Sequence, residues 1–166
     1  MQKTRPKLKI PLTLPEIVIE GVCVLSLLGA ALFMLINYND LPYRIPSHFG
    51  FSGKVDGWGG KGVLFVLLIA NIGLYALLAV LGKFPHTFNY LCEITEENAK
   101  FQYTNARTLI RLIKMEISLI LTYLLCISIL VAKGKAEGVG IAFLPIVLMA
   151  LFGTLAFFII RMIRNK

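Results

Sequence analysis

The chain has 166 residues, of which 57% are hydrophobic and 16% charged, and its mean hydropathy is +0.78. A soluble domain carries about 25% charged residues, and a chain of this length cannot hide so much apolar surface in one core, so a soluble globular protein is excluded. The net charge of +8 gathers at the ends of apolar runs, where basic side chains orient membrane helices and meet anionic lipid. We therefore expect an integral membrane protein whose partner is the lipid bilayer and not nucleic acid.

Four apolar runs follow one another along the chain. They cover residues 17–36, 62–81, 109–132 and 139–160. A bilayer core needs about 20 helical residues, and the third run reaches that length only if Arg111 and Lys114 extend to the membrane surface. The first run is too long for a cleaved signal peptide and is interpreted as a retained signal anchor. The predicted fold is an all-α integral membrane protein, a four-transmembrane-helix bundle that forms a single membrane domain over residues 1–166.

Basic residues are distributed unevenly over the segments between these runs. Twelve of the 17 Lys and Arg residues lie in the N-terminal tail (Lys3, Arg5, Lys7 and Lys9), in the segment at residues 83–114 and in the C-terminal tail. The other five lie in the connections at residues 38–61 and 133–138. Because cytoplasmic segments carry the excess of Lys and Arg, we expect both termini in the cytoplasm and the loop at residues 38–61 outside. The short connection at residues 133–138 is predicted to be a tight turn between helices.

The outer loop at residues 38–61 is rich in turn residues. Pro42 and Pro46 restrict the backbone, and six glycines at residues 50–62 permit angles that other residues avoid. Asp56-Gly57 predicts a tight turn, and Trp58 suits an aromatic belt at the outer membrane surface. We therefore expect a compact, structured loop that packs over the helix ends.

Six residues of this loop are candidate binding residues. They are Pro46, His48, Gly53, Asp56, Trp58 and Lys61. His48 and Asp56 are interpreted either as hydrogen-bonded anchors inside the loop or as an acid–base or cation site at its surface. No set of nucleophile, base and oxyanion donors can be assembled around them, so no catalytic residue is predicted. The glycines do not form a phosphate-binding loop either, because no GK[ST] motif follows them.

The cytoplasmic segment at residues 83–114 contains its own structural signals. Phe84-Pro85 ends the second span, and residues 88–94 nearly alternate in polarity and are interpreted as extended. Thr95 is a good N-cap for one long helix over residues 96–132. The acidic residues after it either cap and solvate this helix or bind a cation or partner. His86 has no second His at ligand spacing, so no metal site and no cofactor are predicted.

Acidic residues also fall inside or beside the apolar runs. Glu16 and Glu20 are four residues apart and share one helix face. A carboxylate at membrane depth usually faces a partner or a wet cavity, and the expected partners of Glu20 are Lys114, Arg111 or Arg161. An ion-pair network and a proton or substrate site are both open interpretations. The candidate polar cluster comprises Glu16, Glu20, Glu116, Asn89, Glu96 and Asn98.

The stretch LPYRIPSHFGFSGKVDGWGGK at residues 41–61 resembles the signature of a bacterial membrane-domain family of unknown function. The later segment containing Asn89, Tyr90 and ITEEN at residues 94–98 resembles a second motif of the same family. This domain also forms the N-terminal part of the SdpI-type immunity proteins, which protect sporulating bacilli from a secreted killing-factor toxin. The resemblance implies a small, multi-pass protein of the bacterial cytoplasmic (inner) membrane.

Three classes of function follow from these features. The first is a non-enzymatic SdpI-like protein in toxin immunity or envelope sensing, whose partner is a peptide toxin or another membrane protein. The second is a small membrane transporter or enzyme that uses His48 and Asp56, or Glu20 and Glu116. The third is a scaffold that packs through small residues, namely Gly138, Gly140 and Gly153. The sequence carries no signal for the oligomeric state.

Overall fold

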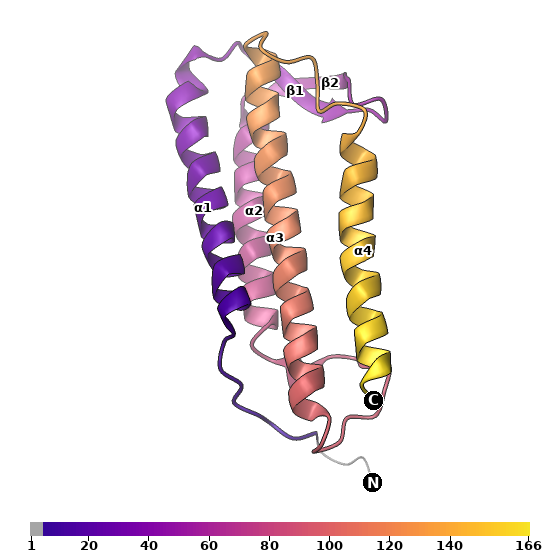
Figure 1. Cartoon of the computed structure of the whole chain (residues 1–166). Helices are drawn as coiled ribbons and strands as arrows, with labels where there is room; N and C mark the ends of the chain where they lie inside the picture. Colours follow the sequence, from indigo (N-terminus) through magenta and orange to yellow (C-terminus); the bar gives the residue numbers. More distant parts are fainter. Residues whose placement is uncertain (1–4) are drawn as a thin grey trace.

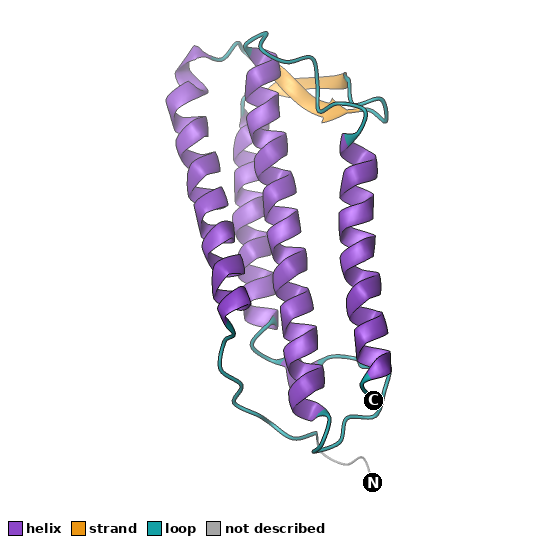
Figure 2. Cartoon of the chain, viewed as in Figure 1, coloured by secondary structure: helices purple, strands orange, loops and turns teal. Residues whose placement is uncertain are grey.

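The computed structural model describes residues 5–166, so Lys3 of the basic N-terminal tail lies outside the described residues. Its long helices are α1 (Leu14–Asn37), α2 (Gly62–Leu81), α3 (Ala99–Ala132) and α4 (Phe143–Arg164). Two 3-10 turns, η1 (Tyr38–Asp40) and η2 (Pro85–Thr87), and two strands, β1 (Arg44–Phe49) and β2 (Val55–Gly60), complete the elements (Figures 1 and 2). All four long helices are long and apolar enough to cross a membrane. The predicted four-span helical fold is therefore confirmed.

Helix α3 is the centre of the arrangement. It packs against α1, α2 and α4, and it also contacts β1, whereas α4 makes its main contacts with α3 alone. In Figure 1, α4 stands on the far side of α3 from α1. The molecule is therefore a three-helix unit of α1, α2 and α3 with α4 attached to one face of α3.

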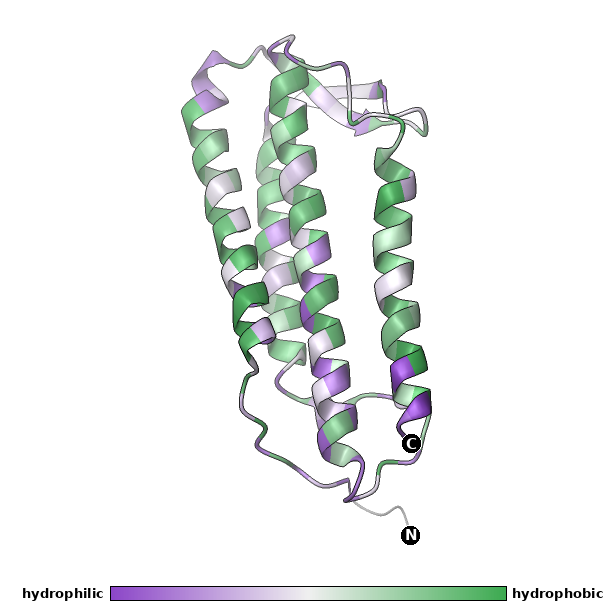
Figure 3. Ribbon diagram, viewed as in Figure 1, coloured by the Kyte–Doolittle hydropathy of each residue, from purple (hydrophilic) through white to green (hydrophobic). Residues whose placement is uncertain are grey.

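The outer sides of the helices carry the apolar residues that a soluble protein would bury. Leu25, Leu35, Ile69 and Met149 are all more than half exposed. In Figure 3 hydrophobic residues run along the middle of the helices, and hydrophilic residues gather at the ends and on the lower half of α3. Exposing apolar surface to water costs about 25 cal/mol per Å², so these helix faces are suited to contact with lipid.

A local sequence signal fixes the start of α1. Thr13 is the N-cap, and Pro15 lies in the first turn, where its missing N–H is not needed. The Glu16 carboxylate accepts hydrogen bonds from both the backbone N–H and the hydroxyl of Thr13, at 2.8 and 3.0 Å. The helix consequently begins three residues before the predicted span at residues 17–36.

The outer loop folds as an antiparallel β-hairpin, which the sequence analysis did not predict. Ile45 is fully buried and Pro46 lies beside it, and together they seat β1 on the helix ends. Ile45 belongs to an apolar core shared by α1, α2 and α3, whose buried members include Met34, Leu64 and Leu125. Apolar burial therefore holds the hairpin in place at this end of the molecule.

The tight turn predicted at Asp56-Gly57 is wrong. Both residues lie inside β2, and the chain reverses instead between Gly50 and Lys54. There the N–H of Gly53 donates to the carbonyl of Gly50 at 2.8 Å, and Gly53 has a φ of +77°. Gly57 serves close packing, because a Cβ at this position would lie 2.9 Å from the Cβ of His48.

The connection between α3 and α4 is also different from the prediction. It is not a tight turn between helices, because residues 138–139 pair with the hairpin turn. Gly138 forms a β-bridge with Lys54, and the N–H of Val139 donates to the carbonyl of Gly53 at 2.8 Å. Helix α4 therefore begins at residue 143, four residues after the predicted start, and Gly138 and Gly140 lie outside the helices.

The segment before α3 departs from two expectations. Residues 88–94 form no strand, and the regular helix begins at Ala99, with Asn98 and not Thr95 at the N-cap position. Thr95 is the first residue of the turn that precedes the helix, because its carbonyl accepts a hydrogen bond from the N–H of Ala99 at 3.0 Å. The helix is otherwise continuous to Ala132, so the third apolar run and the segment before it form one element.

Candidate functional site

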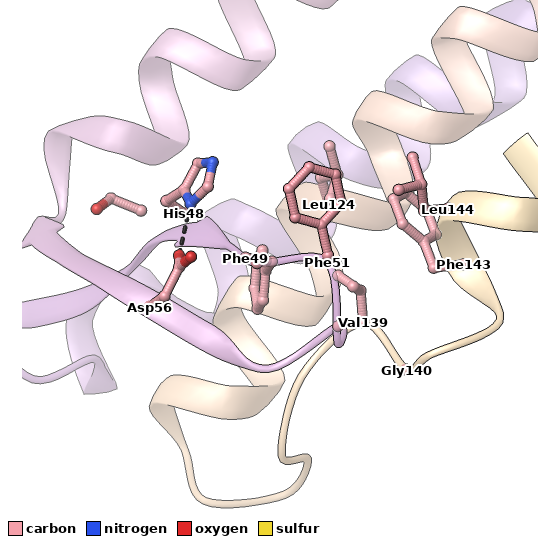
Figure 4. A pocket seen from close by; sticks show the side chains of 12 residues that line it. His48, Phe49, Phe51, Asp56, Leu124, Val139, Gly140, Phe143 and Leu144 are labelled. Carbon is pink, nitrogen blue, oxygen red and sulfur yellow. Dashed lines mark hydrogen bonds and ion pairs between the residues drawn. The ribbon is translucent and has the colours of Figure 1, made fainter. Parts of the chain in front are cut away.

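His48 and Asp56 face each other across the hairpin. His48 lies on β1 and Asp56 on β2, and His48 Nδ1 lies 2.5 Å from Asp56 Oδ1 (Figure 4). Their side chains are 71% and 51% exposed, so the pair contributes little to stability in water. With Nδ1 donating to the carboxylate, the ring is held in one orientation, and Nε2 remains for a ligand.

A cavity of about 450 Å³ lies beside this pair. One wall is the hairpin, with Phe49 and Phe51, and the other is formed by the adjoining parts of α3 and α4, with Leu124 and Phe143 (Figure 4). The lining residues are Ser47, His48, Phe49, Gly50, Phe51, Gly53, Asp56, Leu124, Val139, Gly140, Phe143 and Leu144. Apolar walls with a few polar groups at one edge are typical of a ligand site. We call this site the hairpin cavity.

The far wall of the hairpin cavity is fixed by Tyr123. Its ring stacks on Phe143, with centroids 5.2 Å apart, and its hydroxyl donates to the carbonyl of Val139 at 3.0 Å. Val139 is in turn bonded to the hairpin turn through Gly53. The two walls are therefore connected by hydrogen bonds and have a defined separation.

Three of the six predicted loop residues line the hairpin cavity, and three do not. His48, Gly53 and Asp56 line it, whereas Pro46 is a buried residue of β1 and Trp58 is half exposed elsewhere on the hairpin. Lys61 Nζ donates to the carbonyl of Tyr38 at 3.2 Å and lies over the Tyr38 ring.

The apolar walls were missed by the sequence analysis. They come from segments up to about 95 residues apart in the chain. Their Phe and Leu residues have the composition of any lipid-facing helix, so no sequence signal marks them.

A second group of polar residues lies at the opposite end of the helices. The Glu16 carboxylate is fully buried, and Arg107 binds it with two hydrogen bonds, from Nε at 2.7 Å and from Nη2 at 2.8 Å. Arg107 also donates to the carbonyls of Ile10 and Pro11, at 2.8 and 2.9 Å. This bidentate pair therefore attaches the N-terminal segment to α3 as well as satisfying a buried charge.

Glu20 continues this network one turn along α1. Lys114 Nζ lies 2.6 and 2.8 Å from its two carboxylate oxygens, Arg111 pairs with it, and the Tyr75 hydroxyl donates to it at 3.1 Å. Lys114 Nζ also lies 4.5 Å from the centre of the Tyr75 ring. We call the five residues Glu16, Glu20, Arg107, Arg111 and Lys114 the ion-pair cluster.

Two of the three basic partners expected for Glu20 are present, and the third is not. Arg161 lies 5.2 Å over the Phe101 ring instead. It belongs to α4, which packs on α3 away from α1, so it cannot reach Glu20.

The remaining candidate polar residues lie apart from the ion-pair cluster. Glu116 accepts a hydrogen bond from Thr154 of α4 at 2.6 Å, on the other side of α3. Asn98 accepts from the N–H of Thr95 and donates to the carbonyl of Glu93, both at 2.9 Å. The side chains of Asn89 and Glu96 are exposed and form no hydrogen bond within residues 5–166. The residues grouped in the sequence analysis therefore occupy separate places.

The segment before α3 is held by an aromatic contact. The Tyr90 hydroxyl donates to the carbonyl of Pro85 at 2.7 Å, and its ring lies 5.8 Å from that of Tyr103. Arg5 lies over the Tyr90 ring and donates to the carbonyl of Phe88 at 2.5 Å. Burial raises the pKa of Tyr90 well above its usual value, so the phenol keeps its proton.

Residues 25–85 match the model of a family described as Domain of unknown function (DUF1648). This region includes the second half of α1 (residues 25–37), the whole hairpin and α2. No curated protein and no solved structure matches the chain. The matched region supplies the hairpin wall of the hairpin cavity but not the wall from α3 and α4.

Proposed function

We propose that this chain is a small, non-enzymatic protein of the bacterial inner membrane, of the SdpI-like type, that binds an apolar peptide in the hairpin cavity. Its role is toxin immunity or envelope sensing. The observation that carries the proposal is the cavity itself, whose apolar walls adjoin the exposed His48–Asp56 pair. The motif resemblance to SdpI-type proteins supports the same class, and the family match over residues 25–85 is to a domain of unknown function.

The distribution of basic residues supports an orientation with both termini in the cytoplasm. Twelve of the 17 Lys and Arg residues belong to the two tails and to residues 83–114, and five belong to the two connections at the hairpin end. By the positive-inside rule the hairpin then faces outward. A secreted peptide would therefore meet the hairpin cavity first.

The chemistry of the cavity fits a peptide with apolar side chains. Phe49, Phe51 and Phe143 offer aromatic surface, which dominates the energetics of most interfaces. His48 Nε2 is placed to form a hydrogen bond with a peptide group at the cavity edge. Nothing in this mode of binding requires a covalent step.

The test is survival of a sensitive bacterial strain that produces this chain and is challenged with the secreted killing-factor peptide. The key variant is Phe51→Ala, and the matched control is Tyr43→Ala. Both side chains belong to the outer loop and are strongly exposed, at 90% and 85%, but only Phe51 lines the cavity. We expect protection by the wild type and the control and its loss in Phe51→Ala. No protection by the wild type contradicts the immunity role, and equal effects of the two variants contradict the cavity as the binding site.

The short His48–Asp56 contact favours a second candidate, a small transporter or enzyme that uses this pair. The variants His48→Ala and Asp56→Ala separate it from the binding proposal. A chain that folds, protects and yet loses a transport or catalytic activity would support the second candidate. Unfolding of both variants would support the anchor interpretation. The alternative hypothesis, in which Glu20 and Glu116 act together, is not supported by a contact between them. Glu20 binds Lys114 of α3, whereas Glu116 binds Thr154 of α4.

A further inference from the structure

A second cavity, of about 560 Å³, lies at the end of the molecule opposite the hairpin. Its walls are the N-terminal segment at residues 8–12, the chain just after α2, and α3. Four basic side chains line it, namely Lys9, Lys83, Arg107 and Arg111, and no acidic residue does. We call it the basic cavity.

The charges around the basic cavity do not balance. The ion-pair cluster contains three cations and two carboxylates, Glu16 and Glu20. Lys9 and Lys83 add two more positive charges, and neither has an ion pair or side-chain hydrogen bond within residues 5–166. The Nε of Arg111 is buried and makes no hydrogen bond in the same described part of the chain, and it lies 3.6 Å from Glu16 Oε1, at the distance of an ion pair. Excess positive charge at a membrane surface attracts an anion.

The surroundings of the basic cavity indicate what kind of anion it takes. Leu8 and Leu12 line the cavity and are exposed, and Leu14 and Leu81 are exposed next to it. Side chains of this kind lie in the interface between headgroups and acyl chains. A ligand that satisfies both the basic and the apolar side chains is therefore an anion with an acyl tail.

We propose that the basic cavity binds the phosphate of an anionic phospholipid from the leaflet at this end of the molecule. The guanidinium of Arg111 and the ammonium groups of Lys9 and Lys83 hold the phosphate. The acyl chains lie against Leu8 and Leu12. Because Arg107 bonds the carbonyls of Ile10 and Pro11, the wall at residues 8–12 is already in place before the lipid binds. This site is separate from the hairpin cavity and does not depend on its function.

The test uses the full chain, purified in a neutral detergent and titrated with phosphatidylglycerol or phosphatidylcholine. Binding is read by native mass spectrometry and by the shift in Tm. We expect retained phosphatidylglycerol and a raised Tm, with neither effect from phosphatidylcholine. Equal effects of both lipids would overturn the proposal. Glycerol 3-phosphate is the soluble probe, and a full shift with this probe would assign the site to a free phosphate and contradict the lipid.

The matched variants are two pairs of exposed lysines at the same end of the molecule. Lys9→Gln with Lys83→Gln removes two cations from the basic cavity, and Lys7→Gln with Lys100→Gln removes two that do not line it. Each lysine near an anionic headgroup contributes about a fivefold change in affinity, so we expect roughly 30-fold weaker binding from the first pair. The second pair should retain the wild-type affinity. Equal losses from the two pairs would show general attraction to the basic surface and overturn the site.

Discussion

The hairpin end and the ion-pair end of the molecule both contain a carboxylate bonded to a basic group, but the two pairs differ in burial. His48 and Asp56 are exposed to solvent beside an apolar cavity. The hairpin that carries them is held by the burial of Ile45 and by backbone pairing. Glu16 and Arg107 are buried, and the N-terminal segment depends on them for its position. The exposed pair is consequently accessible to a ligand, whereas the buried pair stabilises the fold. Variants at the two ends test this comparison.

The largest effect is expected at the ion-pair end. Glu16→Gln leaves the Arg107 guanidinium buried without its carboxylate, so the free energy of unfolding should fall by about 3–5 kcal/mol. Unfolding in a denaturing detergent, followed by far-UV circular dichroism, measures it. Glu97→Gln, at an exposed position without a described hydrogen bond, is the control and should change less than about 0.5 kcal/mol. Equal values for the two variants would remove the distinction between the two ends.

The next effect belongs to the hairpin turn. Gly53→Ala places a Cβ against the backbone of Gly140 at a position with a φ of +77°, so we expect a loss of about 2 kcal/mol. Gly60→Ala in β2 meets nothing within 4 Å and should be close to neutral. The same unfolding measurement applies. An unchanged free energy of unfolding in Gly53→Ala would mean that the contact between the hairpin and residues 138–140 does not stabilise the hairpin end of the molecule.

A smaller effect depends on pH. The pKa of Tyr90 is raised in the folded protein by burial, so above about pH 10 the unfolded chain releases this proton first. Stability contributed by the neutral phenol is present below pH 10 and declines as the pH rises, by about 1 kcal/mol per pH unit. Thermal unfolding of the wild type and of Tyr90→Phe between pH 9 and 11 measures the difference. A wild-type slope no steeper than that of Tyr90→Phe would contradict the burial of the hydroxyl.

The smallest effect on stability is expected from His48→Ala. Its pair with Asp56 is exposed to solvent, and exposed pairs contribute less than about 1 kcal/mol. The free energy of unfolding should therefore stay close to that of the wild type. A loss as large as that of Glu16→Gln would instead make His48 a structural anchor and would reverse the comparison between the two ends.

The apolar runs predicted the helices because the length and composition of a span are local properties. The partners Arg111 and Lys114 were predictable for Glu20 because a charge at membrane depth needs an opposite charge at the same depth. Arg161 lies at a similar depth, but the prediction that it pairs with Glu20 was wrong. Depth in the membrane does not indicate which face of α3 another helix covers, and Arg161 lies over the Phe101 ring instead.

The hairpin was not predictable from the same kind of signal. Asp56-Gly57 has the composition of a turn, yet Gly57 is there because His48 packs against it across the sheet. The hairpin cavity has Phe51 on one wall and Phe143 on the other, and the position of the two walls depends on how residues 138–139 pair with the hairpin turn. That pairing has no pattern in the sequence, so only the folded chain reveals it.

The most direct measurement of the central claim is photo-crosslinking from the rim of the hairpin cavity. A benzophenone amino acid replaces Phe51 in one version of the chain and Tyr43 in another, and membranes containing each are irradiated with the killing-factor peptide. The account predicts a covalent adduct of chain and peptide from position 51, and none above background from position 43. Equal adducts from both positions, or none from either, would contradict it.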